Sequence, residues 1–244
     1  MILKTEHLPS LEPFGKTALG CRILAAAEAY GLSEPFAQFW TQGESAAVCK
    51  LDDTVILEIR RAADLEELAS FLRMSGASRL LCSWETAGKM SLPAVRRGAV
   101  MTLSNIKKYT LPADAQINPG VRDIYSLLCR CESPSFPVPE FEPFYLDLSH
   151  RIRHGTALAV GIRKEGALAV CAVCAAMAGP HAVISAVAVA PEFRRMGLGR
   201  TVTEALLSRL PQKKVSVFRA EDENEAFYRS LDFLPGGTFA ELML

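Results

Sequence analysis

The chain has 244 residues, of which half are hydrophobic and 22% are charged, and its mean hydropathy is +0.16. This composition excludes a disordered chain and allows one large core or two modest ones. Lysine plus arginine and aspartate plus glutamate both number 27, so we expect no bulk attraction to nucleic acid or to an anionic membrane. The chain has seven cysteines, which cannot all pair, and its first residues do not show the basic and apolar regions of a signal peptide. We therefore expect a reduced, cytoplasmic protein.

Residues 1–110 are predicted to form a mixed α/β domain. Apolar residues at helical or alternating spacing define its elements, and Gly31 supplies a helix stop. In chain order these are a helix over 18–30, strands over 45–50 and 54–60, a helix over 63–74, and strands over 78–82 and 97–103. Residues 84–96 give no clear pattern. A cluster of prolines in the middle third predicts a boundary between 107 and 122.

A second domain is predicted over residues 111–244, and its pattern is sharper. Its predicted elements are helices over 121–131 and 141–153, strands over 156–163, 167–177 and 182–190, a helix over 197–210, a strand over 214–219, a helix over 223–231 and a strand over 238–243. The first domain loosely repeats the strand–turn–strand–helix–strand order of the second, which hints at a duplication.

Residues 167–190 contain no aspartate, glutamate, lysine or arginine, and their length suits a membrane span. However, Gly179, Pro180 and His181 divide the stretch into two segments rich in valine and alanine, each of strand length. A proline near the middle would also break a spanning helix. We therefore predict a buried hairpin, and no membrane, rather than a lipid-facing helix.

A glycine-rich loop joins the strand over 182–190 to the next helix, and residues 187–200 read VAVAPEFRRMGLGR. Glycines at a helix start let a ligand approach the backbone, whose unpaired amides and positive dipole end attract anions. Arg194, Arg195 and Arg200 add local positive charge. Taken alone, the loop is better explained as a plain connection, because it lacks the third glycine of a dinucleotide site and the Gly-Lys-Ser/Thr of a Walker loop.

Residues 221–233 favour the anion-binding interpretation of the loop over a plain connection. The first of two motifs is Arg194-x-x-Gly197-x-Gly199. The second follows after one helix and one strand and reads Asn224-x-Ala226-x-Tyr228, then Leu231-x-Phe233. The first motif resembles the acyl-CoA loop of the GCN5-related N-acetyltransferase (GNAT) superfamily, and the second resembles that family's next motif. The resemblance covers residues 121–244 well and the earlier part weakly.

The resemblance implies an α/β (α+β) fold with a mixed, mostly antiparallel central sheet flanked by helices, preceded here by the smaller mixed α/β domain. It also implies acetyl-CoA as co-substrate and no metal. The pantetheine arm is expected along the backbone of Val187 and Val189, and the pyrophosphate at the amides of 195–200. The residues expected to bind acetyl-CoA are Val187, Ala188, Val189, Arg194, Arg195, Met196, Gly197, Leu198, Gly199, Arg200, Asn224 and Phe227.

Tyr228 matches the family's usual general acid, which protonates the departing CoA thiolate. A phenol with a pKa near 10 stays protonated at neutral pH, as that role requires. The alternative for Tyr228 is a packed helix aromatic, and the alternative for Asn224 is a helix cap. The N–H of Val189 is expected to polarise the thioester carbonyl.

The sequence departs from the family at the general base. The family often carries a glutamate on the strand before the loop, but no carboxylate lies between His181 and Val189. Glu192 falls past Pro191, near the expected phosphates. Either water removes the proton or the acceptor is a less basic amine, and both readings stay open.

The end of the helix over 141–153 is the second polar feature. His150 and His154 share a helix face, but no glutamate lies between them and no third ligand is evident, so metal is not expected. In the resembled fold this helix borders the acceptor pocket, so Asp147, Ser149, His150 and His154 are candidates for acceptor contacts or for the general base. The alternative is a polar helix end whose cations complement the dipole.

These observations predict an N-acetyltransferase that passes an acetyl group from acetyl-CoA to a primary amine, by direct attack in a ternary complex. The alternative is a non-catalytic sensor that binds acyl-CoA. The N-terminal domain lacks the arginine–glycine loop, so it would not hold CoA in the family's way. It is expected to shape the acceptor site or to form a homodimer face.

Overall fold

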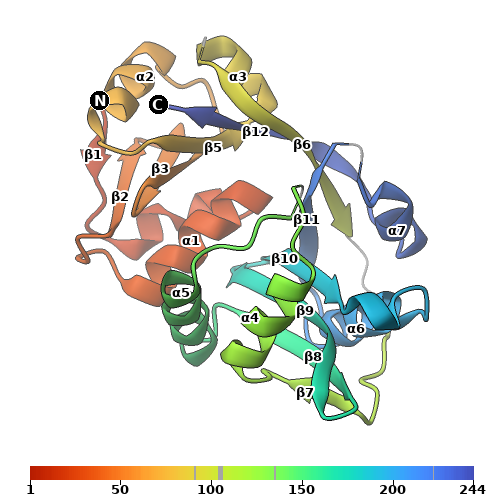
Figure 1. Ribbon diagram of the computed structural model, residues 1–244. Helices are drawn as coiled ribbons and strands as arrows, with labels where there is room; N and C mark the ends of the chain where they lie inside the picture. Colours follow the sequence, from red (N-terminus) through yellow and green to blue (C-terminus); the bar gives the residue numbers. More distant parts are fainter. Residues whose placement is uncertain (91, 104–106, 135, 222) are drawn as a thin grey trace. The chain divides into compact units, whose positions relative to one another are not determined.

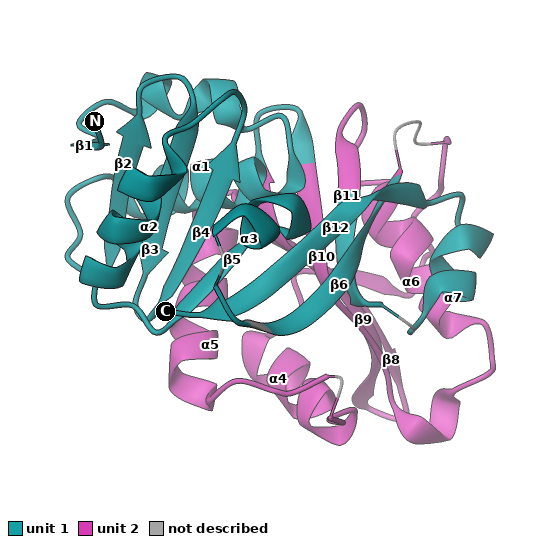
Figure 2. Ribbon diagram, turned by 90° about the horizontal axis from the view of Figure 1, so that it is seen from above, with its two compact units in different colours: residues 1–102, 178–181, 216–244 teal, residues 103–177, 182–215 magenta. Residues whose placement is uncertain are grey.

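The computed structural model describes residues 1–90, 92–103, 107–134, 136–221 and 223–244. They form two compact units (Figure 2). Unit 1 comprises residues 1–102, 178–181 and 216–244, and unit 2 comprises residues 103–177 and 182–215. The units do not follow chain order, because the C-terminal segment packs with the first hundred residues. The domain boundary predicted near residue 110 from the prolines stays a prediction.

Unit 1 is a sheet with helices on both faces. Its strands lie in the order β1-β2-β3-β4-β5-β12-β6-β11 (Figure 1). Its elements are β1 (Leu3–Lys4), η1 (Leu8–Ser10), η2 (Glu12–Phe14), α1 (Ala18–Tyr30), β2 (Ala37–Gln42), β3 (Ala46–Leu51), β4 (Thr54–Ile59), α2 (Leu65–Met74), β5 (Arg79–Ser83), α3 (Trp84–Met90), β6 (Ala94–Leu103), β11 (Lys214–Ala220), α7 (Glu225–Ser230) and β12 (Leu234–Met243).

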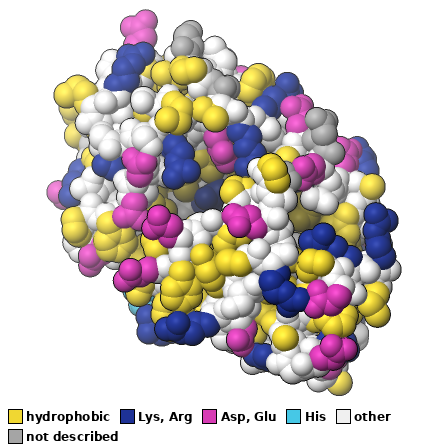
Figure 3. Space-filling view, viewed as in Figure 1, with side chains coloured by type: hydrophobic (Ala, Val, Ile, Leu, Met, Phe, Trp, Pro, Cys, Tyr) yellow, Lys and Arg dark blue, Asp and Glu magenta, His cyan; other side chains and the backbone are white. Residues whose placement is uncertain are grey.

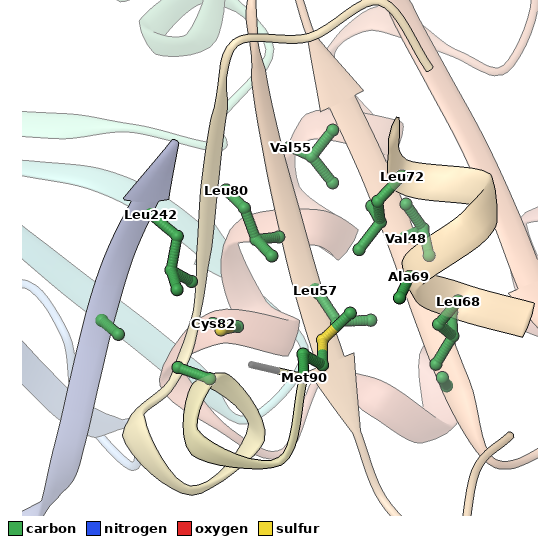
Figure 4. Close-up of a cluster of buried hydrophobic side chains, with 13 residues drawn as sticks. Val48, Val55, Leu57, Leu68, Ala69, Leu72, Leu80, Cys82, Met90 and Leu242 are labelled. Atoms are coloured by element: carbon green, nitrogen blue, oxygen red, sulfur yellow. The ribbon is translucent and has the colours of Figure 1, made fainter. Parts of the chain in front are cut away.

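The last strand of the chain is an inner strand of unit 1. β12 pairs antiparallel with β5 on one side and with β6 on the other, whereas β4 and β5 run parallel. On one face of this sheet, side chains from β3, β4, β5 and β12 pack against α2 and α3 (Figure 4). Leu68 and Leu72 of α2 lie at helical spacing, so both enter this core. The alternate side chains of β3 and β4 face α1 instead.

Unit 2 holds the elements around the glycine-rich loop. Its strands lie in the order β10-β9-β8-β7, and its core joins α4 and α5 to β8, β9 and β10. Its elements are β7 (Ala115–Ile117), α4 (Val121–Arg130), α5 (Phe141–Arg153), β8 (Leu158–Lys164), β9 (Ala167–Ala178), β10 (His181–Val189), η3 (Pro191–Phe193) and α6 (Leu198–Leu207).

The predicted fold class, a mixed and mostly antiparallel sheet flanked by helices, is confirmed. The apolar stretch 167–190 is the predicted hairpin, since β9 and β10 are separated by a turn at Gly179 with a φ of 50°. Among the described residues, no helix is long and apolar enough to cross a bilayer.

Five elements of unit 1, namely β1, η1, η2, β2 and α3, were not predicted, and β2 and α3 are the longest of them. In β2 the buried residues include Gln42, whose side-chain amide forms hydrogen bonds with Asp64 and Glu67. Because a polar residue occupies a buried position, the strand lacks the regular alternation of apolar and polar residues. In α3 the glycine at position 88 obscures the helical pattern. The available signal was Ser83, whose hydroxyl accepts a hydrogen bond from the Thr86 amide at 3.1 Å and caps the helix.

Candidate functional site

The glycine-rich loop of unit 2 connects the end of β10 to the start of α6. Pro191 begins the short helix η3, and the chain then turns through Arg195 and Gly197, whose φ angles are 65° and 79°. The left-handed conformation is inexpensive for glycine and unusual for arginine. A Cβ at Gly197 would meet no atom within 4 Å, so the loop opens to solvent at that point.

The N-terminus of α6 is uncapped. Gly197 occupies the cap position without any side-chain hydrogen bond, and no acidic residue lies in the first turn. The first amides of a helix have no acceptor within the helix, and the dipole places partial positive charge there. The loop from Arg194 to Gly197 is exposed. Exposed amides with nearby guanidinium groups suit a pyrophosphate.

The basic residues of the loop contact the protein itself. Arg194 Nε donates to the carbonyl oxygen of Val189 at 3.2 Å. Arg200 Nη1 lies 3.0 Å from Glu204 Oε1, one turn further along α6. Both side chains are well exposed, so these contacts are weak and leave the cations able to turn toward a bound anion.

Glu192 is the carboxylate nearest in sequence to this loop, and it is paired. Arg130 of α4 forms a short ion pair with it. The backbone amide of Glu192 itself, and then Arg130, lower the pKa of its carboxyl group. Its negative charge is therefore balanced beside the expected phosphate site.

The corresponding position in unit 1 has the opposite chemistry. Between β4 and α2 the cap is Asp64, whose carboxylate accepts a hydrogen bond from the Glu67 amide at 3.0 Å. Glu66 and Glu67 add two further acids to the first turn of α2. A phosphate would meet an occupied amide and three carboxylates there. That the N-terminal part does not bind CoA in the family's way stays a prediction.

The C-terminal motif forms the start of α7 in unit 1. Asn224 stands at the cap position with a φ of 59°, but its side chain makes no capping bond, so the structure does not show it as a side-chain cap. Its carbonyl oxygen accepts from the Tyr228 amide at 3.1 Å. Asp222, part of the same sequence block, lies outside the described residues.

Tyr228 is largely buried, with 7% of its surface exposed. Its ring meets Phe227 and Phe233 edge-on, at centroid distances of 5.0 and 5.6 Å. Burial raises the pKa of its phenol to about 12, because the charged form is poorly solvated. Tyr228 therefore stays protonated over the whole working range of an enzyme.

The polar residues at the C-terminal end of α5 mostly interact with one another. Asp147 pairs with the buried Arg151 at 2.7 Å. The rings of His150 and His154 stack with centroids 4.0 Å apart, and His154 Nδ1 lies 2.9 Å from the His150 carbonyl oxygen. Ser149 is half-buried. In the described part of the chain, no three His, Cys, Asp or Glu side chains group as a metal site.

The structure assigns the predicted residues to the two units. Residues 187–189 and 194–200 and the candidates on α5 lie in unit 2, whereas Asn224, Phe227 and Tyr228 lie in unit 1. Two further residues touch these positions without having been predicted. Cys131 donates from its thiol to the Val189 carbonyl oxygen at 3.3 Å. Arg219 is buried at the end of β11 and binds the segment before α7. Neither has a local sequence signal, because each acts through tertiary contacts.

Comparison with known proteins agrees with this geometry. Residues 121–233 match the acetyltransferase (GNAT) family. A GCN5-related N-acetyltransferase from Kribbella flavida superposes with a TM-score of 0.61 at 16% identity, covering 91% of this chain and 94% of its own. A tandem GNAT protein from the clavulanic acid biosynthesis pathway has a TM-score of 0.59 at 14% identity, covering 100% and 98%.

Saccharomyces cerevisiae N-myristoyltransferase has a similar fold, with a TM-score of 0.64 at 9% identity, covering 100% of this chain and 78% of its own. No curated protein sequence matches significantly. Residues 121–233 are thus similar to the acetyltransferase (GNAT) family, which uses acetyl-CoA as co-substrate. The similarity to the tandem GNAT protein extends over the N-terminal part, so the two chains share their fold there as well.

Proposed function

We propose that this protein is an N-acetyltransferase that transfers an acetyl group from acetyl-CoA to a primary amine, by direct attack in a ternary complex. The observation that carries the proposal is the uncapped N-terminus of α6. There, Gly197 leaves open space and exposed amides beside three arginines. The matching helix start in unit 1 is closed by Asp64, so the open one is a property of the loop sequence rather than of the fold.

The proposed binding mode follows from the strand and the loop. The backbone of Val187 and Val189 would bind the pantetheine arm, and the amides of 195–200 would hold the pyrophosphate. Arg194 would leave the Val189 carbonyl and turn to the phosphates, because a charged acceptor outcompetes a neutral one. Acetyl-CoA supplies an activated thioester, and the N–H of Val189 would donate to its carbonyl oxygen as negative charge develops there.

Tyr228 is proposed as the general acid. The family motif assigns this position to protonation of the departing thiolate, and the buried phenol remains a donor because its pKa is raised to about 12. β10 carries no carboxylate, so a base would have to come from water or from another element. The proposed acceptor contacts on α5 are Asp147, Ser149, His150 and His154, of which Asp147 also pairs with Arg151.

The charge distribution does not favour a polyanionic partner. On the face drawn in Figure 3, the described acidic and basic side chains are interspersed instead of being gathered by sign. With a net charge of zero, the chain offers no long-range attraction to nucleic acid.

A non-catalytic acyl-CoA sensor is the second candidate, and the missing strand carboxylate favours it. The sensor and the enzyme share the same CoA site and differ in turnover. Incubation with acetyl-CoA and a panel of primary amines, followed by thiol release, separates them. Release of CoA above the rate of hydrolysis supports the enzyme, whereas tight binding without turnover supports the sensor.

The cofactor site is tested by calorimetric titration of acetyl-CoA into the wild type and Gly197→Glu. The glutamate adds a side chain and a negative charge where the pyrophosphate is proposed, so binding should be lost. Gly166→Glu is a matched control, because Gly166 also has a positive φ, of 83°, and open space, but lies in the β8–β9 turn. Equal binding by all three proteins would refute the proposed site.

A further inference from the structure

Arg219, the penultimate residue of β11, is a buried guanidinium that binds the segment leading into α7. Only 7% of its side chain is exposed. Nη1 donates to the carbonyl oxygens of Ala220, at 2.8 Å, Glu221 and Glu223, at 3.2 Å. Nη2 forms a short ion pair with Glu225. A buried cation is stable only when paired and hydrogen-bonded, so its contacts fix the conformation of this segment.

The backbone of Arg219 is itself held in place. A Cβ at Gly98 of β6 would lie 2.6 Å from the Arg219 carbonyl oxygen and 2.2 Å from the Phe239 ring, which shows how closely these strands approach. The guanidinium therefore extends from a rigid part of the sheet. It transmits that rigidity to a segment that carries an unusual backbone angle at Asn224.

The segment held by Arg219 is the one that starts the helix of Tyr228. Glu225 is the first residue of α7, and the Tyr228 amide donates to the Asn224 carbonyl oxygen at 3.1 Å. On its other side, the Tyr228 carbonyl oxygen accepts from the Leu231 and Phe233 amides, each at 3.0 Å. The C-terminal side of Tyr228 is thus held by local bonds. Its N-terminal side is held by the Asn224 carbonyl and by ion pairs of Glu221 with Arg97, at 3.4 Å, and of Glu225, and among these cations Arg219 is the buried one that also binds the backbone.

We propose that Arg219 is a positioning residue for Tyr228: by fixing Ala220, Glu221, Glu223 and Glu225 from the sheet, it sets the place of the phenol in the acetyl-transfer reaction. The inference rests on the proposed function, in which Tyr228 protonates the thiolate. Arg219 acts through Asn224 and Glu225 and does not itself touch substrate. A displacement of about 1 Å in a catalytic group can cost about 100-fold in rate.

The chain supplies a matched control on the same carboxylate. Arg229 Nε also pairs with Glu225, at 2.6 Å, but its side chain is 51% exposed and has no hydrogen bond to a carbonyl of the described residues before α7. Arg219→Met and Arg229→Met each remove one cation from Glu225. We expect kcat to fall about 10- to 100-fold in Arg219→Met and less than about 2-fold in Arg229→Met.

The pH dependence of kcat distinguishes positioning from simple loss of stability. If α7 loosens, Tyr228 becomes hydrated, and its pKa falls from about 12 toward its ordinary value near 10. The alkaline limb of the kcat profile should therefore move to lower pH in Arg219→Met and stay in place in Arg229→Met. If kcat and its profile are unchanged in folded Arg219→Met, or change equally in both variants, the proposal is wrong.

Two further measurements cover the remaining outcomes. If Arg219→Met does not fold, Arg219→Lys and Glu225→Gln replace it, because each keeps part of the contacts. Both should show the same changes in kcat and its pH profile, but smaller ones. An unchanged kcat in both variants overturns the proposal. If the wild type binds acetyl-CoA but turns over no amine, the proposed function fails separately. Hydrogen exchange across residues 225–231 then tests Arg219, and unchanged exchange in Arg219→Met overturns its role.

Discussion

The carboxylate of Asp64 accepts a 3.0 Å hydrogen bond from the amide of Glu67 at the first turn of α2. In unit 2 the same helix position is Gly197, which has no side chain to offer. Both helices follow a strand and a short loop, yet one N-terminus is closed by an acid and the other is open to an anion. A single cap residue therefore separates a structural helix start from a proposed phosphate site.

Asp64→Ala should lower the free energy of unfolding by about 1 kcal/mol, because the helix loses its cap. Asp64→Asn keeps an acceptor oxygen at the same position and should cost less. Urea unfolding of the two variants and the wild type checks the order. A stability of Asp64→Ala equal to that of the wild type would mean that the cap contributes nothing.

Glu58 should make the protein less stable as the pH rises. It lies on β4, is 7% exposed and is bonded to Thr17, and burial raises its pKa from 4.5 to about 7. The folded state holds this proton more tightly than the unfolded state does. Stability is thus fully present below pH 4.5 and is lost as the pH rises through 7. At about 1.4 kcal/mol per pKa unit, the loss is about 3 kcal/mol.

Glu58→Gln should remove this part of the pH dependence. Urea unfolding between pH 5 and pH 8 should show a smaller loss of stability with rising pH in the variant than in the wild type. Glu44→Gln serves as the control, because Glu44 forms an exposed pair with Arg61. If Glu58→Gln and Glu44→Gln retain the same slope, Glu58 titrates normally and the argument from burial fails.

Gly98→Ala and Gly88→Ala should change stability in opposite directions. A Cβ at Gly98 would clash with the Phe239 ring and the Arg219 carbonyl, so we expect a loss of about 2–4 kcal/mol. Gly88 lies within α3 with open space around it, so alanine should stabilise by about 0.5–1 kcal/mol. Thermal unfolding of both variants tests the pair, and equal shifts would contradict the packing argument.

Tyr228→Phe should reduce kcat by about 100-fold while leaving the Kd for acetyl-CoA unchanged, because only the proton donor is removed. The ring contacts with Phe227 and Phe233 are kept, so the fold should survive. Tyr30→Phe, which removes a hydroxyl from α1, is the control and should leave kcat unchanged. A Tyr228→Phe enzyme with full activity would assign proton donation to another group.

Local rules determined the parts of this protein that depend on neighbours in sequence. The helix over 18–30 matched α1, because good helix formers end at a glycine with positive φ. The apolar stretch 167–190 became a hairpin, since Gly179 and Pro180 cannot continue a helix or a strand. The glycines of residues 187–200 likewise predicted a strand-to-helix loop there, because they act through the local backbone, whereas its use as an anion site was predicted only together with the motif at 224–233.

Tertiary structure alone decided which distant segments meet. Nothing in the sequence of β12 says that it lies between β5 and β6, because hydrogen-bond donors and acceptors along a strand do not identify their partners. The same holds for Arg219 and Glu58, whose charges look solvated in the sequence. Arg219 is buried by the packing around α7, and Glu58 by the packing of α1. Burial allows Arg219 to act as a positioning residue, and it raises the pKa of Glu58.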